Sequence, residues 1–200
     1  MKPITKSSVD KNPFKQFAKW YDIALNSDIY EPTAMILATA GKDGIPSART
    51  VLLKEYDERG FVFYTNYESR KGNELGENPN TELLFLWKEH ERQVRISGIA
   101  ERTSQQESEE YFKTRPYDSR VGAWASMQSS IIPDRNFLEK KFEEIKLKYG
   151  KKEIPLPSFW GGFRVVPHTF EFWQGRRSRL HDRICYKKKD KIWEIVRLSP

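Results

Sequence analysis

The sequence predicts a mainly β protein, an antiparallel barrel with peripheral α-helices, and three observations support this fold class. Short segments rich in β-branched and aromatic residues follow one another in pairs joined by short turns, as hairpin strands do. Helical segments stand between groups of strands, whereas a parallel sheet would need one after nearly every strand. With 38% hydrophobic and 14% aromatic residues among 200, the chain can fill one core, so we expect a single domain spanning 1–200.

The expected helices show apolar residues that recur every three or four positions, with capping residues at their ends. In the first helix, Phe14, Phe17, Tyr21 and Leu25 follow this spacing. Gly150 is the expected stop of the last one. The predicted helices span residues 12–26, 69–78, 104–114 and 134–149, and a short helix follows Pro116 with Asp118 and Ser119 as its candidate caps.

The expected strands are short apolar runs bounded by turn residues. Turns are predicted at residues 41–44 and 57–60, and residues 154–157 form a stiff linker. Residues 1–10 are polar, which predicts a disordered end. The predicted strands span residues 35–40, 46–56, 61–66, 81–87, 91–102, 159–166, 169–174 and 183–198, the last with a turn near Lys189.

The composition restricts the classes of function. A formal net charge of +7 is compatible with nucleic acid, an anionic membrane surface or small anions such as phosphates. The cations are dispersed among acidic residues and form no basic stripe, which argues against a nucleic-acid-binding barrel. The single cysteine, Cys185, excludes an internal disulfide framework and fits a reducing compartment. Because the sequence shows neither a secretory signal nor an apolar run of roughly 20 residues, we expect a cytoplasmic protein without membrane contact.

Several common sites have no support in the sequence. No G-x-G-x-x-G motif follows a strand and no G-x-x-x-x-G-K-[ST] motif occurs, which argues against a Rossmann or P-loop nucleotide site. The spacings His-x-x-x-His and Cys-x-x-Cys are absent, so we expect no protein-bound metal. A G-x-S-x-G nucleophile elbow is absent too.

The segment WQGRRSRLHDR, residues 173–183, contains the densest mixture of chemistry in the chain. Its four arginines repel one another unless anions lie among them, Trp173 offers a flat ring, and His181 brings an imidazole, a side-chain type suited to proton transfer. This mixture suits a flat, anionic, aromatic ligand. The alternative is a solvated basic hairpin loop beside a core tryptophan.

Two cations, Arg49 and Lys54, lie on an otherwise apolar strand in RTVLLK. Side chains alternate between the faces of a strand, so these two point to opposite faces unless a twist or bulge intervenes. If both serve one site, we expect such an irregularity, or two ligands contacted from different sides. The alternative is an ordinary strand with charged ends.

Three further segments carry binding chemistry. Arg70 and Lys71 follow the candidate cap Ser69, and positive charge in a first helical turn is unfavourable unless an anion binds there. Tyr111 and Arg115 share a helical face, which Ser119 joins only if the chain folds back after Pro116. The polar run at residues 126–130, and Gln93 on a strand, suit hydrogen bonding to a heteroaromatic edge. Each segment alone is equally compatible with an ordinary surface.

Taken together, these segments resemble the pyridoxamine 5'-phosphate oxidases of the FMN-binding split-barrel superfamily. The matching stretches run in the family's order from Pro32 to the end of the chain: RTVLLK, FVFYTNYESRK, ERQVRISG, YFKTRPYDSRVGAW, QSS, PLPSFWGGFRV, and EFWQG followed by RLHDR. The resemblance implies an antiparallel six-stranded split barrel and a homodimer with FMN at its interface, residues 159–200 completing the site and the dimer.

The resemblance also implies the roles of individual residues. Arg179 and His181 would lie over the substrate ring as the catalytic residues. The substrate phosphate would be held by Lys54, Tyr111, Arg115 and Ser119. The FMN site would comprise Arg49, Val51, Leu52, Tyr64, Thr65, Arg70, Lys71, Gln93, Gln128, Ser129, Trp173 and Arg183, some of them from the partner subunit.

The implied reaction oxidises pyridoxamine 5'-phosphate, and pyridoxine 5'-phosphate, to pyridoxal 5'-phosphate, with O2 as acceptor and H2O2 as product. Two alternatives stay open: a related split-barrel oxidase of phenazine biosynthesis, and a flavin- or B6-binding protein without turnover. The sequence departs from the family twice. MKPITKSSVDKN lacks the Arg-Arg-Glu-Tyr-like segment that closes over the substrate, and Arg176-Arg177 replace a more neutral stretch.

Overall fold

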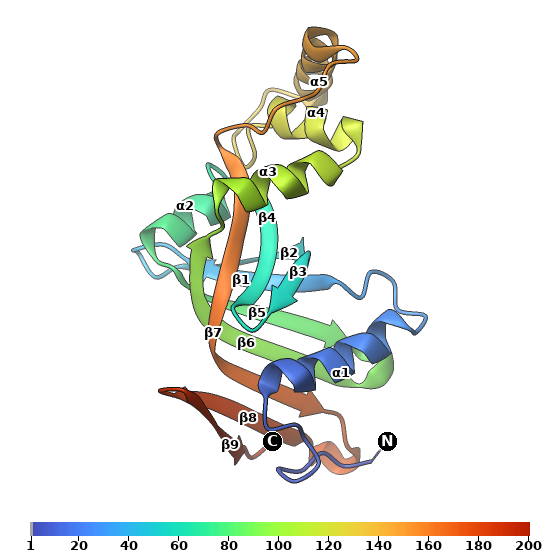
Figure 1. The fold of residues 1–200 in the computed structure, drawn as a ribbon, viewed down its shortest axis with the longest axis vertical. Coiled ribbons are helices and arrows are strands. Elements are labelled where there is room, and N and C mark those ends of the chain that lie inside the picture. The colour runs from blue at the N-terminus through green and yellow to red at the C-terminus, as the bar shows by residue number, and fades with distance from the viewer. Residues whose placement is uncertain (1) are drawn as a thin grey trace.

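The computed structural model describes residues 2–200, and one antiparallel sheet runs through most of them (Figure 1). The fold class is confirmed: the described part of the chain is mainly β, with five α-helices around a curled sheet. The strands are β1 (Ala34–Ala40), β2 (Pro46–Leu52), β3 (Glu55–Asp57), β4 (Gly60–Asn66), β5 (Asn80–Trp87), β6 (Arg92–Arg102), β7 (Trp160–Gln174), β8 (Asp182–Lys189) and β9 (Ile192–Arg197).

The sheet has nine strands in the described residues, where six were expected. Its main path is β2-β1-β5-β6-β7-β4-β3, and β8 pairs with both β7 and β9. The strands beyond the expected number are the three-residue β3 and the C-terminal hairpin β8–β9, which lengthen the sheet at one edge and beside β7.

Two strand limits differ from the sequence prediction. The run 46–56 is two strands, because the chain leaves its partner β1 after Leu52 and then pairs with β4. Residues 159–174 form one strand, not two, although Pro167 interrupts the apolar pattern. The ladder between β6 and β7 shifts its register beside Gly98, and such a bulge accommodates a residue that has no N–H to donate.

The helices are α1 (Pro13–Leu25), α2 (Arg70–Glu77), α3 (Gln105–Thr114), α4 (Tyr117–Ala125) and α5 (Arg135–Tyr149). The predicted caps Asn12, Ser69, Ser104 and Asp134 each accept a hydrogen bond from a backbone N–H of the first turn. The cap of α4 was predicted wrongly: Pro116 occupies the position itself, because its fixed φ suits the entry to a helix. Among the described residues, no helix is long and apolar enough to cross a bilayer.

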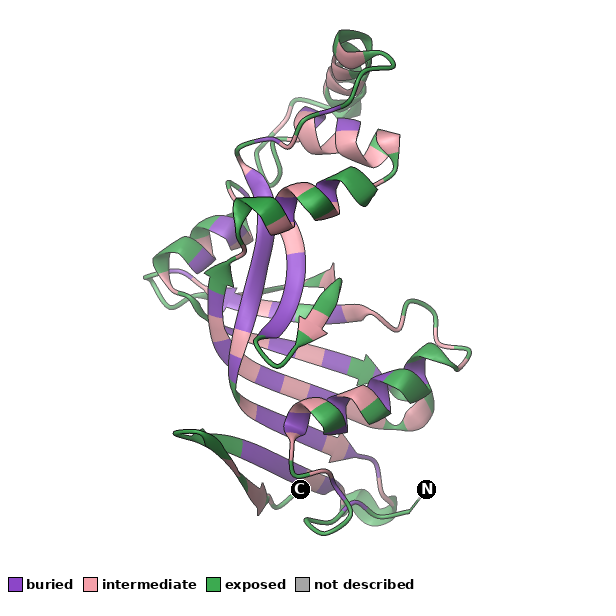
Figure 2. Cartoon of the chain, in the orientation of Figure 1, coloured by how far each residue is buried: buried purple, intermediate pink, exposed green. Residues whose placement is uncertain are grey.

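The main core lies between α1 and the sheet, and buried residues occur along both α1 and the strands beside it (Figure 2). Phe17, fully buried, packs edge-on against Phe61 of β4 and Phe85 of β5. A second, smaller core holds α3 and α4 against the start of β7, with Phe112, Val121 and Trp160 buried in it. Helices α3, α4 and α5 therefore extend beyond one end of the sheet (Figure 1).

Two residues of the N-terminal segment contact the rest of the protein, although most of residues 2–10 are exposed; the expected disorder of this end stays a prediction, and Met1 lies outside the described residues. Ile4 and Val9 are buried, the backbone N–H of Ile4 donates to Asp182 at 3.2 Å, and Arg197 donates to the carbonyl of Ile4 at 3.1 Å. Polar composition did not reveal this docking, because its partners lie at the opposite end of the chain.

Candidate functional site

A cleft of about 560 Å³ opens where β2, β4, the first turn of α2 and the corner between α3 and α4 meet. It brings together most of the residues that the sequence predicted for one site, although they come from five segments of the chain. The predicted residues that line the cleft are Arg49, Val51, Leu52, Lys54, Tyr64, Thr65, Lys71, Tyr111, Arg115, Ser119 and Gln128.

A change of strand partner places both Arg49 and Lys54 on this cleft. The backbone N–H of Leu53 donates to Thr33, next to β1, whereas that of Lys54 donates to Val62 of β4, both at 2.9 Å. The alternation of faces along β2 is therefore broken between the two cations. This is the irregularity expected if both serve one site.

The ammonium group of Lys71 is half-buried in the cleft and donates only to neutral oxygens. Its partners are Oε1 of Gln128 at 2.8 Å, Oγ1 of Thr65 at 3.1 Å and Oγ of Ser69 at 3.3 Å. Burial, and secondarily the nearby charge of Arg49, lower the pKa of Lys71 to about 8. An ammonium group that has only neutral partners among the described residues can bind an anion. The bound anion would raise the pKa of Lys71 again.

The lowered pKa of Lys71 predicts how anion binding depends on pH. The free cleft loses the Lys71 proton above about pH 8, whereas a bound anion favours the ammonium, so binding in that range takes up a proton. We expect the affinity for a phosphorylated flavin to fall above pH 8, by up to about tenfold per pH unit, with no contribution from Lys71 below that pH. Fluorescence titrations between pH 6.5 and 9.5 measure this pH dependence of the affinity. The Lys71→Arg variant stays charged in this range, so the same decline in that variant would contradict the assignment of the decline to Lys71.

Arg49 is held by a carboxylate that the sequence prediction missed. Its guanidinium donates to Glu74 of α2 at 3.1 Å, and Arg70 donates to the other oxygen of the same carboxylate at 2.8 Å. Hydrogen bonds from Ser47 and Thr39, with those from the two arginines, hold the pKa of Glu74 at about 2 despite its burial. Arg70 is thereby turned away from the cleft that it was predicted to line, although its spacing of four residues from Glu74 is a local signal of this pair.

Arg115 forms the second cationic centre, at the corner between α3 and α4. Within residues 2–200, its buried Nη1 has no hydrogen-bond partner. The guanidinium lies 4.6 Å from the ring centroid of Trp160, and burial lowers the pKa of Arg115. Ser119 lies in the first turn of α4 and also lines the cleft, so the chain does fold back after Pro116.

Stacked aromatic rings line the same cleft. Tyr64 and Tyr111 stack with centroids 3.9 Å apart, and Trp160 lies parallel to Tyr64 at 5.6 Å. Burial raises the pKa of Tyr64, which keeps its phenol neutral. Trp160 was not predicted as a site residue, although it lies in the stretch PLPSFWGGFRV that carries part of the family resemblance.

The other predicted residues lie apart from the cleft within one chain. Gln93, Trp173 and Arg183 stand opposite one another on β6, β7 and β8 and share the outer face of the sheet. The ring of His181 lies 4.7 Å from that of Trp173, and its Nδ1 accepts from the backbone N–H of Arg176 at 3.1 Å. Arg179 is exposed, with a left-handed φ of 60°.

Ser129 is exposed and does not line the cleft, whereas its neighbour Gln128 contacts Lys71. Arg183 pairs with Glu171 at 2.8 Å. A single chain therefore assembles most of the predicted site, but not Arg70, Gln93, Ser129, Trp173, Arg179, His181 and Arg183.

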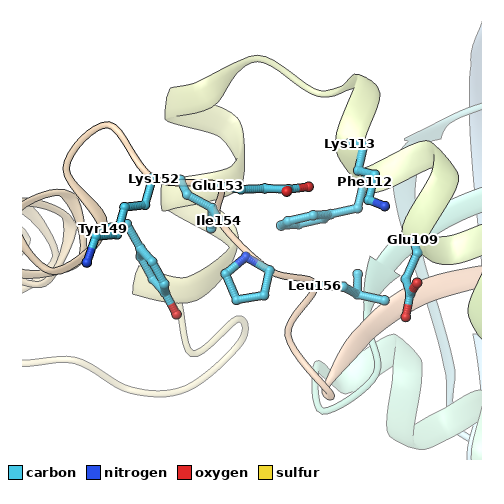
Figure 3. A pocket seen from close by; sticks show the side chains of 9 residues that line it. Glu109, Phe112, Lys113, Tyr149, Lys152, Glu153, Ile154 and Leu156 are labelled. Atoms are coloured by element: carbon cyan, nitrogen blue, oxygen red, sulfur yellow. The ribbon is translucent and has the colours of Figure 1, made fainter.

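A second cleft of about 520 Å³ lies between α3 and the linker before β7 (Figure 3). Its floor is apolar, with the buried side chains of Phe112 and Ile154, and its charged residues, such as Lys113 and Glu153, occur in both signs. None of the predicted site residues lines it. Without a concentration of one charge it offers no anion site, so we take the polar cleft as the candidate site.

Two family models match the chain. Residues 22–149 match the model described as "Pyridoxamine 5'-phosphate oxidase", and residues 160–200 match the "Pyridoxine 5'-phosphate oxidase C-terminal dimerisation region". The chain belongs to the pyridoxamine 5'-phosphate oxidase family. The first model covers β1–β6 and α2–α5, which contain both cationic centres of the cleft, and the second covers β7–β9 with Trp173, Arg179, His181 and Arg183.

Curated members of this family resemble the chain over its whole length. A pyridoxine/pyridoxamine 5'-phosphate oxidase of Trichormus variabilis is 56% identical and covers 100% of this chain and 94% of its own. One of Rubrobacter xylanophilus is 52% identical, covering 98% of this chain and 91% of its own.

Among solved structures, PhzG from Burkholderia lata, in complex with tetrahydrophenazine-1-carboxylic acid, superposes with a TM-score of 0.92 at 31% identity, covering 97% of this chain and 95% of its own. A pyridoxamine 5'-phosphate oxidase-related, FMN-binding protein of Nostoc punctiforme shares the fold, with a TM-score of 0.75 at 16% identity.

Proposed function

We propose that this protein is an FMN-dependent oxidase that converts pyridoxamine 5'-phosphate, and pyridoxine 5'-phosphate, to pyridoxal 5'-phosphate, with O2 as acceptor and H2O2 as product. The observation that carries the proposal is the presence of four cations, Lys71 with Arg49 and Arg115 with Lys54, in one cleft that stacked aromatic rings also line. Two phosphorylated ring compounds, a flavin and a vitamin B6 substrate, match this arrangement.

The first cationic centre fits the phosphate of FMN. The half-buried ammonium of Lys71 has only neutral partners, so an anion would find a cation without a competing carboxylate bonded to it. Arg49 adds a second charge, and Val51, Leu52, Tyr64 and Thr65 would line the rest of the cofactor site. When bound, FMN would supply the redox chemistry, a hydride transfer from the substrate carbon with O2 as the final electron acceptor. With the amine substrate, water would then hydrolyse the resulting imine to the aldehyde and ammonia.

The second cationic centre fits the phosphate of the substrate. Arg115 presents an unsatisfied buried donor, and the fork of a guanidinium can give a phosphate two hydrogen bonds. Tyr111, Ser119 and Lys54 line the same cleft and would add hydroxyl donors and a charge. Two fixed phosphates would orient the substrate carbon toward the flavin, and such positioning lowers a barrier by several kcal/mol.

We infer that a second copy of the chain completes the site. Gln93, Ser129, Trp173 and Arg183 of one protomer do not reach that protomer's own cleft, and three of them share the outer face of the sheet. On that face Ile36 and Leu86 are 38% and 56% exposed, as expected of a surface that another chain covers. A homodimer with FMN at its interface accounts for both observations.

The lone buried Cys185 suits a reducing compartment, so we place the reaction in the cytoplasm.

Arg179 and His181 would act on the substrate ring, Arg179 by orienting it and His181 by hydrogen bonding or moving a proton. The Nδ1 atom of His181 accepts a hydrogen bond, which leaves Nε2 carrying the proton. Both Ser178 and Arg179 have left-handed φ values, 56° and 60°, and such strain is concentrated at functional loops.

Replacing Arg179 with alanine is expected to reduce kcat/KM by a factor on the order of a hundred or more, as loss of a charge contact to substrate does. The flavin content should change little, because Arg179 is exposed and lies outside the FMN cleft. Flavin absorbance and steady-state kinetics on the same preparation separate the two effects. An equal loss of flavin and of turnover would contradict this division of roles.

The likeness to PhzG supports a second candidate, oxidation of a tricyclic phenazine precursor. Such a substrate would need no phosphate site, whereas this chain has Lys54, Tyr111, Arg115 and Ser119 in the lining of the cleft. A third candidate is a protein that binds flavin or B6 vitamers without turnover.

A peroxide assay on purified, yellow protein tests these candidates. We expect pyridoxamine 5'-phosphate to yield H2O2 and pyridoxal 5'-phosphate in equal amounts. Oxidation of a dihydrophenazine carboxylate alone would favour the second candidate, and binding of the phosphorylated amine without peroxide would favour the third. A colourless protein that does not take up FMN would overturn the proposal itself.

A further inference from the structure

Glu74 lies at the centre of a closed hydrogen-bond network behind the first cationic centre. Its Oε2 accepts from Thr39 at 2.5 Å, from Ser47 at 2.6 Å and from Arg49 at 3.1 Å, and its Oε1 accepts from Arg70 at 2.8 Å. The side chains of Glu74 and Arg49 are only 11% and 19% exposed. The family comparison assigns no role to this carboxylate, which lies outside the residues that line the cleft.

This network already uses the donors of Arg49 that a phosphate would need. Nη1 donates to the carbonyl of Leu37 and to Thr39, and Nη2 donates to Ser47 and Glu74. Each of these nitrogens carries two hydrogens, so all four are engaged. An arriving phosphate can bond to the end of the guanidinium only if it shares or displaces one of the present acceptors, and Glu74 is the charged one among them.

The charges of the group also match a phosphate monoester. Arg49, Arg70 and Lys71 contribute three positive charges and Glu74 one negative charge, which leaves a net charge of +2. A phosphate monoester carries roughly −1.5 to −2 near neutral pH. With Glu74 present, the occupied site is therefore close to neutral, and the empty site keeps its arginines paired.

We propose that Glu74 is the internal counter-ion of the phosphate site: it holds Arg49 and Arg70 in place while the site is empty, and it competes with the flavin phosphate for Arg49. This inference rests on the proposed function, because it takes the phosphate of FMN as the anion that binds beside Arg49. Glu74 is thus a positioning residue with two effects: it lowers the affinity for FMN, and it stabilises the site while no phosphate is bound.

Replacing Glu74 with glutamine, in the full-length protein freed of flavin, tests the proposal. We expect the Kd for FMN to decrease on the order of tenfold, because a repelling charge close to the phosphate is removed. The Kd for riboflavin, which has no phosphate, should not change. The melting temperature without ligand should fall, and inorganic phosphate should raise it more in the variant than in the wild type.

The matched control is Glu77→Gln, one turn further along α2, where the carboxylate accepts from the backbone N–H of Lys42 and contacts neither arginine. It should bind FMN as the wild type does. If the Glu74 variant does not fold, the Ser47→Ala variant is the alternative test. It removes a hydroxyl bonded to both Arg49 and Glu74, and we expect it to bind FMN about twofold to threefold more tightly.

The outcomes separate this inference from the proposed function. A wild-type protein that binds FMN no better than riboflavin would refute the phosphate site, and with it the function. Tighter FMN binding by the wild type than by Glu74→Gln, or equal binding by the two, would overturn the counter-ion role alone. Ser47→Ala without a gain in FMN affinity would overturn it as well if Glu74→Gln is unfolded.

Discussion

Arg49→Ala is expected to be purified as largely flavin-free protein, with a Kd for FMN raised by at least about 30-fold. The substitution removes one of the two cations of the phosphate site that line the cleft, and it leaves the carboxylate of Glu74 close to the phosphate with Arg70 as its one remaining arginine partner among residues 2–200. Both changes act against an anion. The ratio of flavin to protein absorbance in the purified variant measures the effect directly.

The control for this experiment must lose a buried arginine without touching the cleft. Arg164 of β7 suits the purpose, because its side chain is only 10% exposed and it pairs with Asp57 and Glu107 at 3.2 and 2.8 Å. Arg164→Ala should lose stability and still carry flavin. Normal flavin content in the Arg49 variant would show that the phosphate of FMN does not bind beside Arg49.

The helix limits could be predicted from the sequence because the signals that set them are local. Ser104 illustrates this: its side chain accepts from the backbone N–H of Glu107, while the Glu107 carboxylate accepts from the N–H of Ser104. The four residues involved are contiguous. The same applies to Ser69, which caps α2 through the N–H of Gly72.

The strand limits were less predictable because the neighbouring strand decides them. Pro167 is tolerated within β7 because β6 shifts its register beside it, where Gly98 allows a close approach: a Cβ on Gly98 would lie 2.5 Å from the carbonyl oxygen of Val166. Nothing within residues 159–174 reveals that partner. The docking of Ile4 against Asp182 is equally non-local.

The cleft could be predicted as a set of residue types, but not as a set of contacts. Positive charge at the start of α2 predicted an anion site formed by Arg70 and Lys71 alike, whereas only Lys71 lines the cleft. The difference arises from Glu74, which takes up the Arg70 guanidinium one turn away. Trp160 was not predicted as a site residue, because its place in the site depends on its contact with Arg115. The guanidinium of Arg115 lies over the Trp160 ring and comes from another segment of the chain.

Arg115→Met is expected to separate substrate binding from every other property of the protein. The guanidinium of Arg115 lies among aromatic rings, and within residues 2–200 its buried Nη1 has no hydrogen-bond partner. Its charge therefore lowers the stability of the protein without ligand. Methionine has a similar length and no charge. The variant should therefore be as stable as the wild type or more so, by about 1 kcal/mol.

The kinetic expectation for Arg115→Met has the opposite sign. Without the guanidinium the substrate phosphate loses its forked donor, and kcat/KM for pyridoxamine 5'-phosphate should fall by about a hundredfold or more, with flavin content unchanged. Arg120→Met is the matched control, since Arg120 also has a buried nitrogen without a partner within residues 2–200 but does not line the cleft. Because the stability of the variant is preserved, a loss of activity can come only from the substrate site. Unchanged kinetics would mean that the second cationic centre binds no phosphate, and the unphosphorylated phenazine substrate would then become the better candidate.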